Sequence, residues 1–226
     1  MDRALYRQPP LLVTEQELPE LEKIGYPIHR SAGVPFFLEG ELGDFALLIR
    51  KGHVKVTRGS PPRIIDVRGP GAIVGELAVK FRRPRSASII AWDDVEALYL
   101  PGDSWKQFLD EHPRANDALM SNLGDMLDRQ ATKNVESELA VEQRLAKGLT
   151  ELTESGLGQP TGEGAMVLRR VSQQDLADLI GAKIDSVKKI IRLLKASGIV
   201  DTGRQVITIL QPATLREIAD GNRTVS

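Results

Sequence analysis

The chain has 226 residues, a hydrophobic fraction of 41% and a formal net charge of −1, which is ordinary for a globular protein of one large or two modest domains. It contains no cysteine, which excludes disulfides, thiolate zinc sites, iron–sulfur clusters and thiol catalysis. No apolar run approaches the roughly 18 residues that span a bilayer, and the first ten residues lack the apolar core of a signal peptide. We therefore expect a soluble cytoplasmic protein with no membrane partner.

The first hundred residues carry signals for many short strands. Residues 1–23 predict a loose arm and a short acidic helix, and from about residue 26 to 100 apolar runs alternate with Gly, Pro and Asp turns. This spacing is typical of antiparallel sandwiches and barrels, and GHVKV alternates polar and apolar residues as a half-buried strand does. The region predicts an antiparallel β-roll.

Helix signals take over at Asp103. This residue is a candidate cap for one helix, and Pro113 is a candidate first-turn residue for the next. One long helix is expected over residues 114–150, which contain no proline and only Gly124 and Gly148. A possible apolar seam, interrupted by Asn134 and Glu138, consists of Leu123, Leu127, Ala131, Val135, Val141 and Leu145. It indicates either a surface helix packed on the sandwich or, as we prefer, the interface of a side-by-side homodimer.

The C-terminal third has the helix start and stop signals of a helix–turn–helix. Ser172 and Asp175 have the spacing of a capping box, and Gly181 ends that first helix. A second helix is expected over 183–197, followed by a two-stranded hairpin over 200–210. A hairpin after two such helices predicts a winged helix–turn–helix, a shape that fits the major groove of DNA.

The second helix has one apolar and one basic face. Val187, Ile190, Ile191 and Leu194 share the side that we expect in the core, and Asp185, Lys188, Lys189, Arg192 and Lys195 lie opposite. A basic face can simply keep a helix solvated, but residues 144–226 also hold 12 Lys and Arg against 9 Asp and Glu. We expect these cations to meet phosphates of double-stranded DNA. The candidate DNA-binding residues are Ser172, Gln174, Lys183, Ile184, Asp185, Ser186, Lys188, Lys189 and Arg204.

The stretch GELAVKFRRPRSASI, residues 75–89, has the chemistry of a small-anion site. Gly75 lets the backbone approach a ligand closely, and Arg85 and Ser86 are donors suited to a phosphate. Glu76 would repel a phosphate but accepts hydrogen bonds from sugar hydroxyls, so a ribose phosphate explains both charges. The alternative is a turn with a surface Glu–Arg pair, worth about 0–1 kcal/mol.

These motifs resemble the CRP/FNR family of bacterial regulators. GELA…RPRSASI resembles the phosphate-binding cassette of the cyclic-nucleotide-binding domain, and VSQQDLADLIGAKIDSVKKIIRLLKASGIV resembles the family's winged helix–turn–helix. The resemblance covers about residues 24–215 in the family's order. It implies that Glu76 binds the ribose 2′-hydroxyl and that Arg85 and Ser86 hold the cyclic phosphate. The backbone of Gly75, Leu77, Ala78 and Ala87 would line the cassette.

The sequence departs from the family's pattern at three places. The long-helix positions that usually supply hydroxyl or amide contacts to the base are Arg129 and Gln130 here. The base-reading Arg-Glu…Arg pattern of the second helix appears as Ile184, Asp185 and Lys189, so the usual operator is not assumed. The cassette loop is unusually basic, and its Lys80, Arg82 and Arg83 are either solvated or meet a second phosphate.

The expected fold class is α+β, with an N-terminal antiparallel β jelly-roll at 1–113, a long dimerisation helix at 114–147 and a C-terminal winged helix–turn–helix domain at 148–226. The resemblance implies a dimeric, sequence-specific transcription regulator controlled by a cyclic nucleotide, cAMP or a relative, with RNA polymerase as a further partner. The alternatives are a regulator independent of cyclic nucleotides and an interaction module whose helix–turn–helix contacts protein. We expect no enzyme activity, metal or cofactor, because the three histidines are isolated and no nucleotide-hydrolysis or catalytic-triad motif occurs.

Overall fold

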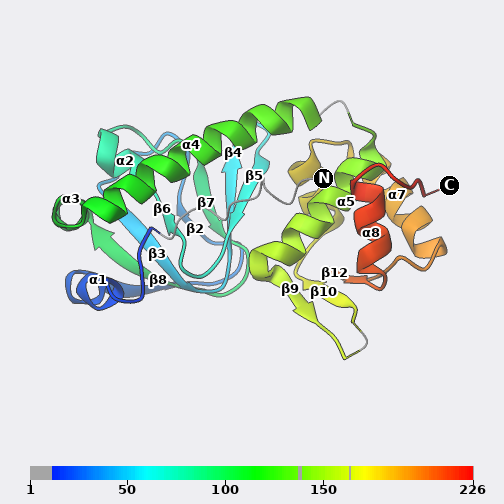
Figure 1. Ribbon diagram of the computed structural model, residues 1–226, viewed down its shortest axis with the longest axis horizontal. Coiled ribbons are helices and arrows are strands. Elements are labelled where there is room, and N and C mark those ends of the chain that lie inside the picture. Colours follow the sequence, from blue (N-terminus) through cyan, green and yellow to red (C-terminus); the bar gives the residue numbers. More distant parts are fainter. Residues whose placement is uncertain (1–11, 137–138, 163, 226) are drawn as a thin grey trace.

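The computed structural model describes residues 12–136, 139–162 and 164–225, and for residues 129–136 it describes the backbone alone. Figure 1 shows a β-sandwich and a smaller C-terminal domain, with one long helix running from the far end of the sandwich to the other domain. Among the described residues, no helix is long and apolar enough to cross a membrane.

The N-terminal domain is a sandwich of two antiparallel sheets. One sheet has the order β1 (Tyr26–Arg30), β8 (Val95–Pro101), β3 (Phe45–Lys51) and β6 (Ile73–Val74). The other has the order β2 (Pro35–Phe37), β7 (Ser88–Ala91), β4 (Val54–Arg58) and β5 (Arg63–Arg68). Leu47 and Ile49 from the first sheet and Val54 and Ile89 from the second belong to one buried cluster between the sheets. The predicted antiparallel β-roll is confirmed.

Four helices surround this sandwich: α1 (Leu18–Ile24), α2 (Glu76–Phe81), α3 (Gly102–Glu111) and α4 (Pro113–Glu136). Trp105 of α3 and Leu119 of α4 are buried in a second cluster against the first sheet. Pro113 is the first residue of α4, as predicted. The prediction that Asp103 caps α3 is wrong, because the helix already begins at Gly102 and makes no side-chain cap.

The single helix expected over residues 114–150 is also wrong, because the chain forms two helices there. Helix α4 ends at Glu136, and α5 begins at Val141 and runs to Leu152. Leu145, expected in a dimer seam, is fully buried with Leu149 in the core of the C-terminal domain. In the same seam, the side chains of Ala131, Asn134 and Val135 and all of Glu138 lie outside the described part of the chain.

The C-terminal domain is a winged helix–turn–helix. Its sheet has the order β11 (Val200–Gly203), β12 (Val206–Ile209), β10 (Met166–Arg169) and β9 (Gly158–Pro160). Its helices are α5, the short π-helical turn η1 (Thr153–Leu157), α6 (Gln173–Ile180), α7 (Ile184–Ala196) and α8 (Pro212–Ala219). The capping box of Ser172 and Asp175 and the left-handed cap at Gly181, with φ of 61°, are both confirmed.

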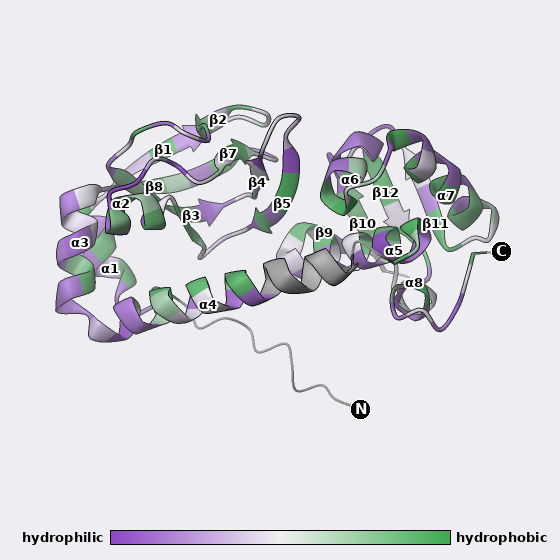
Figure 2. Cartoon of the chain, turned by 90° about the horizontal axis from the view of Figure 1, so that it is seen from above, coloured by the Kyte–Doolittle hydropathy of each residue, from purple (hydrophilic) through white to green (hydrophobic). Residues whose placement is uncertain are grey.

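The two domains pack on each other through the β4–β5 side of the sandwich. Ile64 of β5 and Trp92, just after β7, belong to the same buried cluster as the winged-helix core. The indole Nε1 of Trp92 donates a 2.9 Å hydrogen bond to the carbonyl of Arg170. Figures 1 and 2 both show β5 facing the C-terminal domain, with α7 at the end of the molecule farthest from the sandwich.

Candidate nucleotide pocket and DNA-binding helix

The predicted anion site is a tight turn that leads from β6 into α2. Gly75 is the cap of α2 and has φ of 81°, in the left-handed region that favours glycine. A Cβ at this position would lie only 2.5 Å from Nη1 of Arg85. The glycine is therefore required both by the backbone conformation and by the close approach of the arginine.

Arg85 is buried inside this turn, with 2% of its surface exposed. Its Nη1 donates to the carbonyl of Gly75 and its Nη2 to the carbonyl of Phe45, both at 2.8 Å. The guanidinium also lies 4.0 Å and 4.3 Å from the ring centroids of Phe37 and Phe45. Its buried Nε has no hydrogen-bond partner among the described residues. Because a buried donor without an acceptor is costly, this nitrogen adds to the cost of burying the arginine here.

Glu76, the first residue of α2, lies next to this arginine. Burial raises the pKa of Glu76, and the backbone N–H groups of Glu76 and Leu77 and the charges of Arg68 and Arg85 act against that rise. Burial likewise lowers the pKa of Arg85, while Glu76 acts against that change. The site therefore presents an acceptor and a donor whose opposite charges act on each other.

A cavity of about 830 Å³ opens beside the turn. Its wall includes every predicted residue of the cassette: Gly75, Glu76, Leu77, Ala78, Arg85, Ser86 and Ala87. Helix α4 closes one side with Leu119, Asn122, Leu123 and Met126. Helices α5 and α6 of the winged-helix domain reach the far end through Arg144, Lys147 and the 178–181 turn. The cavity thus touches both domains and the helix between them.

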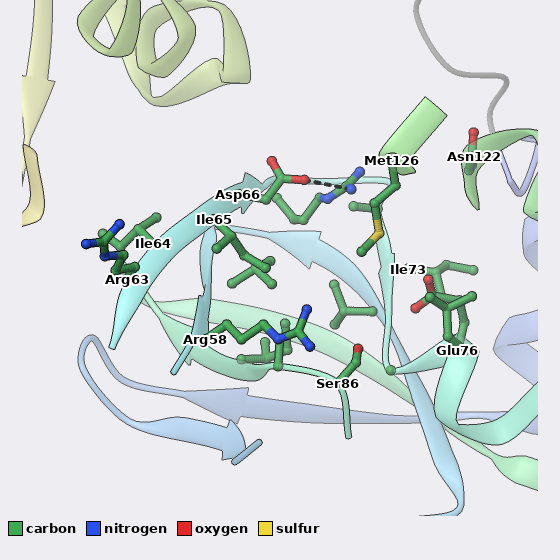
Figure 3. A pocket seen from close by; sticks show the side chains of 18 of the residues that line it. Arg58, Arg63, Ile64, Ile65, Asp66, Ile73, Glu76, Ser86, Asn122 and Met126 are labelled. Atoms are coloured by element: carbon green, nitrogen blue, oxygen red, sulfur yellow. Dashed lines mark ion pairs between the residues drawn. The ribbon is translucent and has the colours of Figure 1, made fainter. Parts of the chain in front are cut away.

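Two expected base contacts are not tested by this geometry. Arg129 and Gln130 lie on α4, in the stretch whose side chains are outside the described part of the chain. An ion pair between Asp66 and Arg68 of β5 lies in the cavity wall and was not predicted from the sequence. Its nearest N and O atoms are 2.7 Å apart. Figure 3 shows Asp66 on the side of the cavity near Met126, with Glu76 and Ser86 on the other side. The alternate spacing of Asp66 and Arg68 on a strand was the available signal.

Helix α7 has the two faces that its sequence predicts. Val187, Ile191 and Leu194 are at most 2% exposed and belong to the winged-helix core, and Ile190 packs against them. The opposite face is exposed along its length and carries Asp185, Lys188, Lys189, Arg192 and Lys195. A protruding basic helix face is the feature that winged helix–turn–helix proteins present to the major groove.

The remaining predicted DNA contacts lie at the start of α6, at the start of α7 and in the wing. Gln174, Lys183 and Arg204 are exposed, and Ser186 is half-buried. The hydroxyl of Ser172 is engaged with Asp175 in the capping box. Ile184 packs partly against the domain core, so less of its side chain faces outward than the prediction required. Among the described residues, no group of histidine, aspartate and glutamate has the arrangement of a metal site.

Comparisons with known proteins match the same two regions. Residues 27–112 match the model of the cyclic nucleotide-binding domain, and residues 143–218 match that of the Crp-like helix-turn-helix domain. The chain is 28% identical over 197 residues to the cyclic AMP receptor protein of Thermus thermophilus, covering 84% of this chain and 86% of that protein. It is 29% identical over 169 residues to a CRP-like cAMP-activated global transcriptional regulator of Mycobacterium tuberculosis, covering 72% and 74%.

A solved structure of a CRP/FNR-family transcriptional regulator from Thermus thermophilus shares the fold, with a TM-score of 0.72 at 24% identity, covering 86% of this chain and 98% of that one. The order of a cyclic-nucleotide-binding β-roll, a connecting helix and a winged helix–turn–helix defines the class as a transcription regulator, not an enzyme. The chain belongs to the CRP/FNR family.

Proposed function

We propose that the protein is a cytoplasmic bacterial homodimer whose affinity for specific DNA sites is set by a cyclic nucleotide, cAMP or a relative, bound in the N-terminal domain. The observation that carries this proposal is that Arg85 and all the other predicted cassette residues line one cavity of about 830 Å³. Two guanidinium nitrogens of Arg85 are fixed by main-chain carbonyls, so the side chain is positioned before a ligand arrives.

In this proposal the ligand's cyclic phosphate accepts from Arg85 and from the exposed hydroxyl of Ser86. The ribose 2′-hydroxyl donates to Glu76, and the base extends toward α4. Leu123 and Met126 of α4 line the cavity and would contact the base, together with Arg129 and Gln130 at the positions that the family uses. Ligand contacts with α4 and with the 178–181 turn would couple occupancy to the position of the winged helix.

The dimer is proposed on the outward face of α4. Met120 and Leu127 are 39% and 59% exposed there, seven positions apart, while Leu119, about 100° around the helix from Met120, is buried. Two exposed apolar side chains at heptad spacing are suited to a second copy of the same helix. A dimer would place two α7 helices at a separation of about 34 Å, one turn of DNA. We also propose a domain boundary at residue 113, and we move the second boundary from residue 147 to the break before Val141, because Leu145 and Ala146 of α5 are buried in the winged-helix core.

RNA polymerase is proposed as a further partner on the strength of family membership alone. A second candidate function is DNA binding independent of cyclic nucleotide. This candidate is favoured by the residues at two positions of the long helix. cAMP-responsive members usually carry a Thr together with a Ser or Asn there, whereas this chain carries Arg129 and Gln130.

The test is isothermal titration of the full chain with cAMP and cGMP, followed by a DNA mobility shift with and without the ligand that binds. Ser86→Ala and Arg85→Lys should weaken binding, because each removes a donor to the phosphate. Arg85→Ala is less informative, since it also leaves the carbonyls of Gly75 and Phe45 without donors. A chain that binds DNA equally well with and without every nucleotide would support the second candidate.

A further inference from the structure

The wall of the cavity opposite the cassette holds an arginine that the phosphate site does not use. Arg68 ends β5 and pairs with Asp66, and each side chain is about one-third exposed. The second oxygen of Asp66 accepts from the backbone N–H of Val67 at 2.8 Å. Because the carboxylate is held on both sides, it fixes the guanidinium through one nitrogen, and the other N–H groups of Arg68 are left for a ligand in the cavity.

The position of Arg68 is that of a base contact rather than a phosphate contact. Figure 3 shows Asp66, with a dashed line to its ion-pair partner, on the side of the cavity near Met126 of α4 and across from Ser86. The charge of Arg68 also acts on Glu76, the residue proposed to hold the ribose. A base attached to that ribose and extending toward Met126 would pass along Arg68.

The other cations in the cavity wall have different places. Arg144 donates to the carbonyl of Ile180 at 2.8 Å, and Arg63 lies beside Gly181, so both belong to the winged-helix end. Arg58 faces Glu39, with 3.6 Å between Nε and the nearer carboxylate oxygen. Arg68 is therefore the arginine at the boundary between ribose and base.

We propose that Arg68 selects a guanine base, with Asp66 as the residue that positions it; this inference rests on the proposed function. A guanidinium is a planar fork of donors, and guanine presents two acceptors, O6 and N7, on one edge. Adenine presents N7 next to an amino group on that edge. One N–H group of the guanidinium would then face another hydrogen-bond donor instead of an acceptor. The shared chemistry is a guanine next to a cyclic phosphate, as in 3′,5′-cGMP or in the dinucleotide c-di-GMP.

The experiment is isothermal titration of the full chain with cGMP, cAMP, c-di-GMP and c-di-AMP. We expect one guanine ligand to bind at least about tenfold more tightly than its adenine counterpart. Arg68→Met should reduce that ratio to within about threefold, and Asp66→Asn should reduce it partly. The matched control is Arg50→Met, which also removes an arginine paired with a carboxylate, that of Glu22, but lies outside the cavity wall.

Comparison of cGMP with cAMP and of c-di-GMP with c-di-AMP distinguishes the two sources of guanine. The proposal is supported if either comparison shows a preference for the guanine ligand and Arg68→Met abolishes that preference. Tighter binding of the adenine ligands, or a guanine preference that survives Arg68→Met, overturns it while leaving the proposed function in place. Binding of none of the four overturns both. If Arg68→Met unfolds, Arg68→Lys keeps the charge without the fork, and the same loss of preference is expected.

Discussion

The ammonium group of Lys55 in the β-sandwich forms an ion pair with the carboxylate of Asp175 in the winged-helix domain. Both side chains are largely buried, at 21% and 16% exposure, and the ammonium lies 4.5 Å from the ring centroid of Trp92. Asp175 also receives hydrogen bonds from Ser172 in the capping box. One carboxylate therefore fixes the start of α6 and joins it to the other domain.

Lys55→Met should loosen the two domains without breaking the capping box. The substitution leaves the partly buried carboxylate of Asp175 without its cation, which costs about 1–3 kcal/mol. In differential scanning calorimetry we expect the transition of the variant to broaden or divide. Lys51→Met is the control, because its pair with Glu96 is highly exposed and lies within one domain. Equal effects of the two substitutions would contradict a special role for Lys55.

Glu76→Gln should stabilise the protein without ligand while removing its affinity for nucleotide. Burial raises the pKa of Glu76, so the folded chain holds the proton more tightly than the unfolded chain does. The free energy of unfolding of the wild type therefore falls as pH rises from the ordinary pKa of 4.5 through the raised value. Glutamine is neutral throughout, so its advantage in thermal unfolding should be present at pH 7 and absent below pH 4. A wild type that is more stable than the variant at pH 7 would refute this.

Lys189→Ala should weaken DNA binding by a similar factor for all sequences. Lys189 is exposed on the basic face of α7, where it would neutralise one phosphate. Loss of one such contact should lower the slope of log affinity against log salt by about 0.9. Fluorescence anisotropy at several salt concentrations measures this slope. Lys23→Ala, on α1 at the far end of the sandwich, should leave it unchanged.

Leu127→Glu should convert the proposed dimer to a monomer. Leu127 is 59% exposed on the outward face of α4, and a charge there would face a second copy of itself across a twofold interface. Sedimentation equilibrium measures the mass. The control is Leu42→Glu, since Leu42 is 86% exposed but lies in a loop of the β-roll. A wild type that sediments as a monomer would remove the basis of this prediction.

The start of α4 should show an acid-sensitive attachment to the N-terminal segment. Burial acts to raise the pKa of Glu17, but hydrogen bonds from Arg114 and Thr14 outweigh it and lower the pKa to about 2. The contribution to stability is therefore present above the ordinary pKa of 4.5 and is lost as pH falls toward about 2. Glu17→Gln should lower the melting temperature at pH 7 and have little effect near pH 2. A difference that is the same at both pH values would show that the ion pair does not titrate.

Local chemistry in the sequence was sufficient for many elements. The Ser172–Asp175 spacing located the start of α6, and Pro113 located the start of α4, because caps depend on a few adjacent residues. The cassette residues, which are close together in the sequence, line one cavity. For the two helix starts, the deciding interactions lie within about one turn of chain.

Long-range packing accounts for what the sequence did not predict. Nothing in the local periodicity separates α4 from α5, and the break becomes understandable only because Leu145 and Leu149 are buried in the winged-helix core. Likewise, the charges of Asp66 and Arg68 are ordinary for a strand facing water. Their placement in a cavity depends on α4, which is more than fifty residues further along the chain.

The two tryptophans of the chain occupy different kinds of interior. Trp105 is fully enclosed among α3 and its neighbours, whereas Trp92 is enclosed only where one domain meets the other. Separation of the two domains would expose the indole of Trp92 to water and leave that of Trp105 buried. The intrinsic tryptophan fluorescence of the protein should therefore report domain movement as ligand or DNA is added. Exposure of Trp92 would shift its emission to longer wavelength, while the emission of Trp105 would stay unchanged.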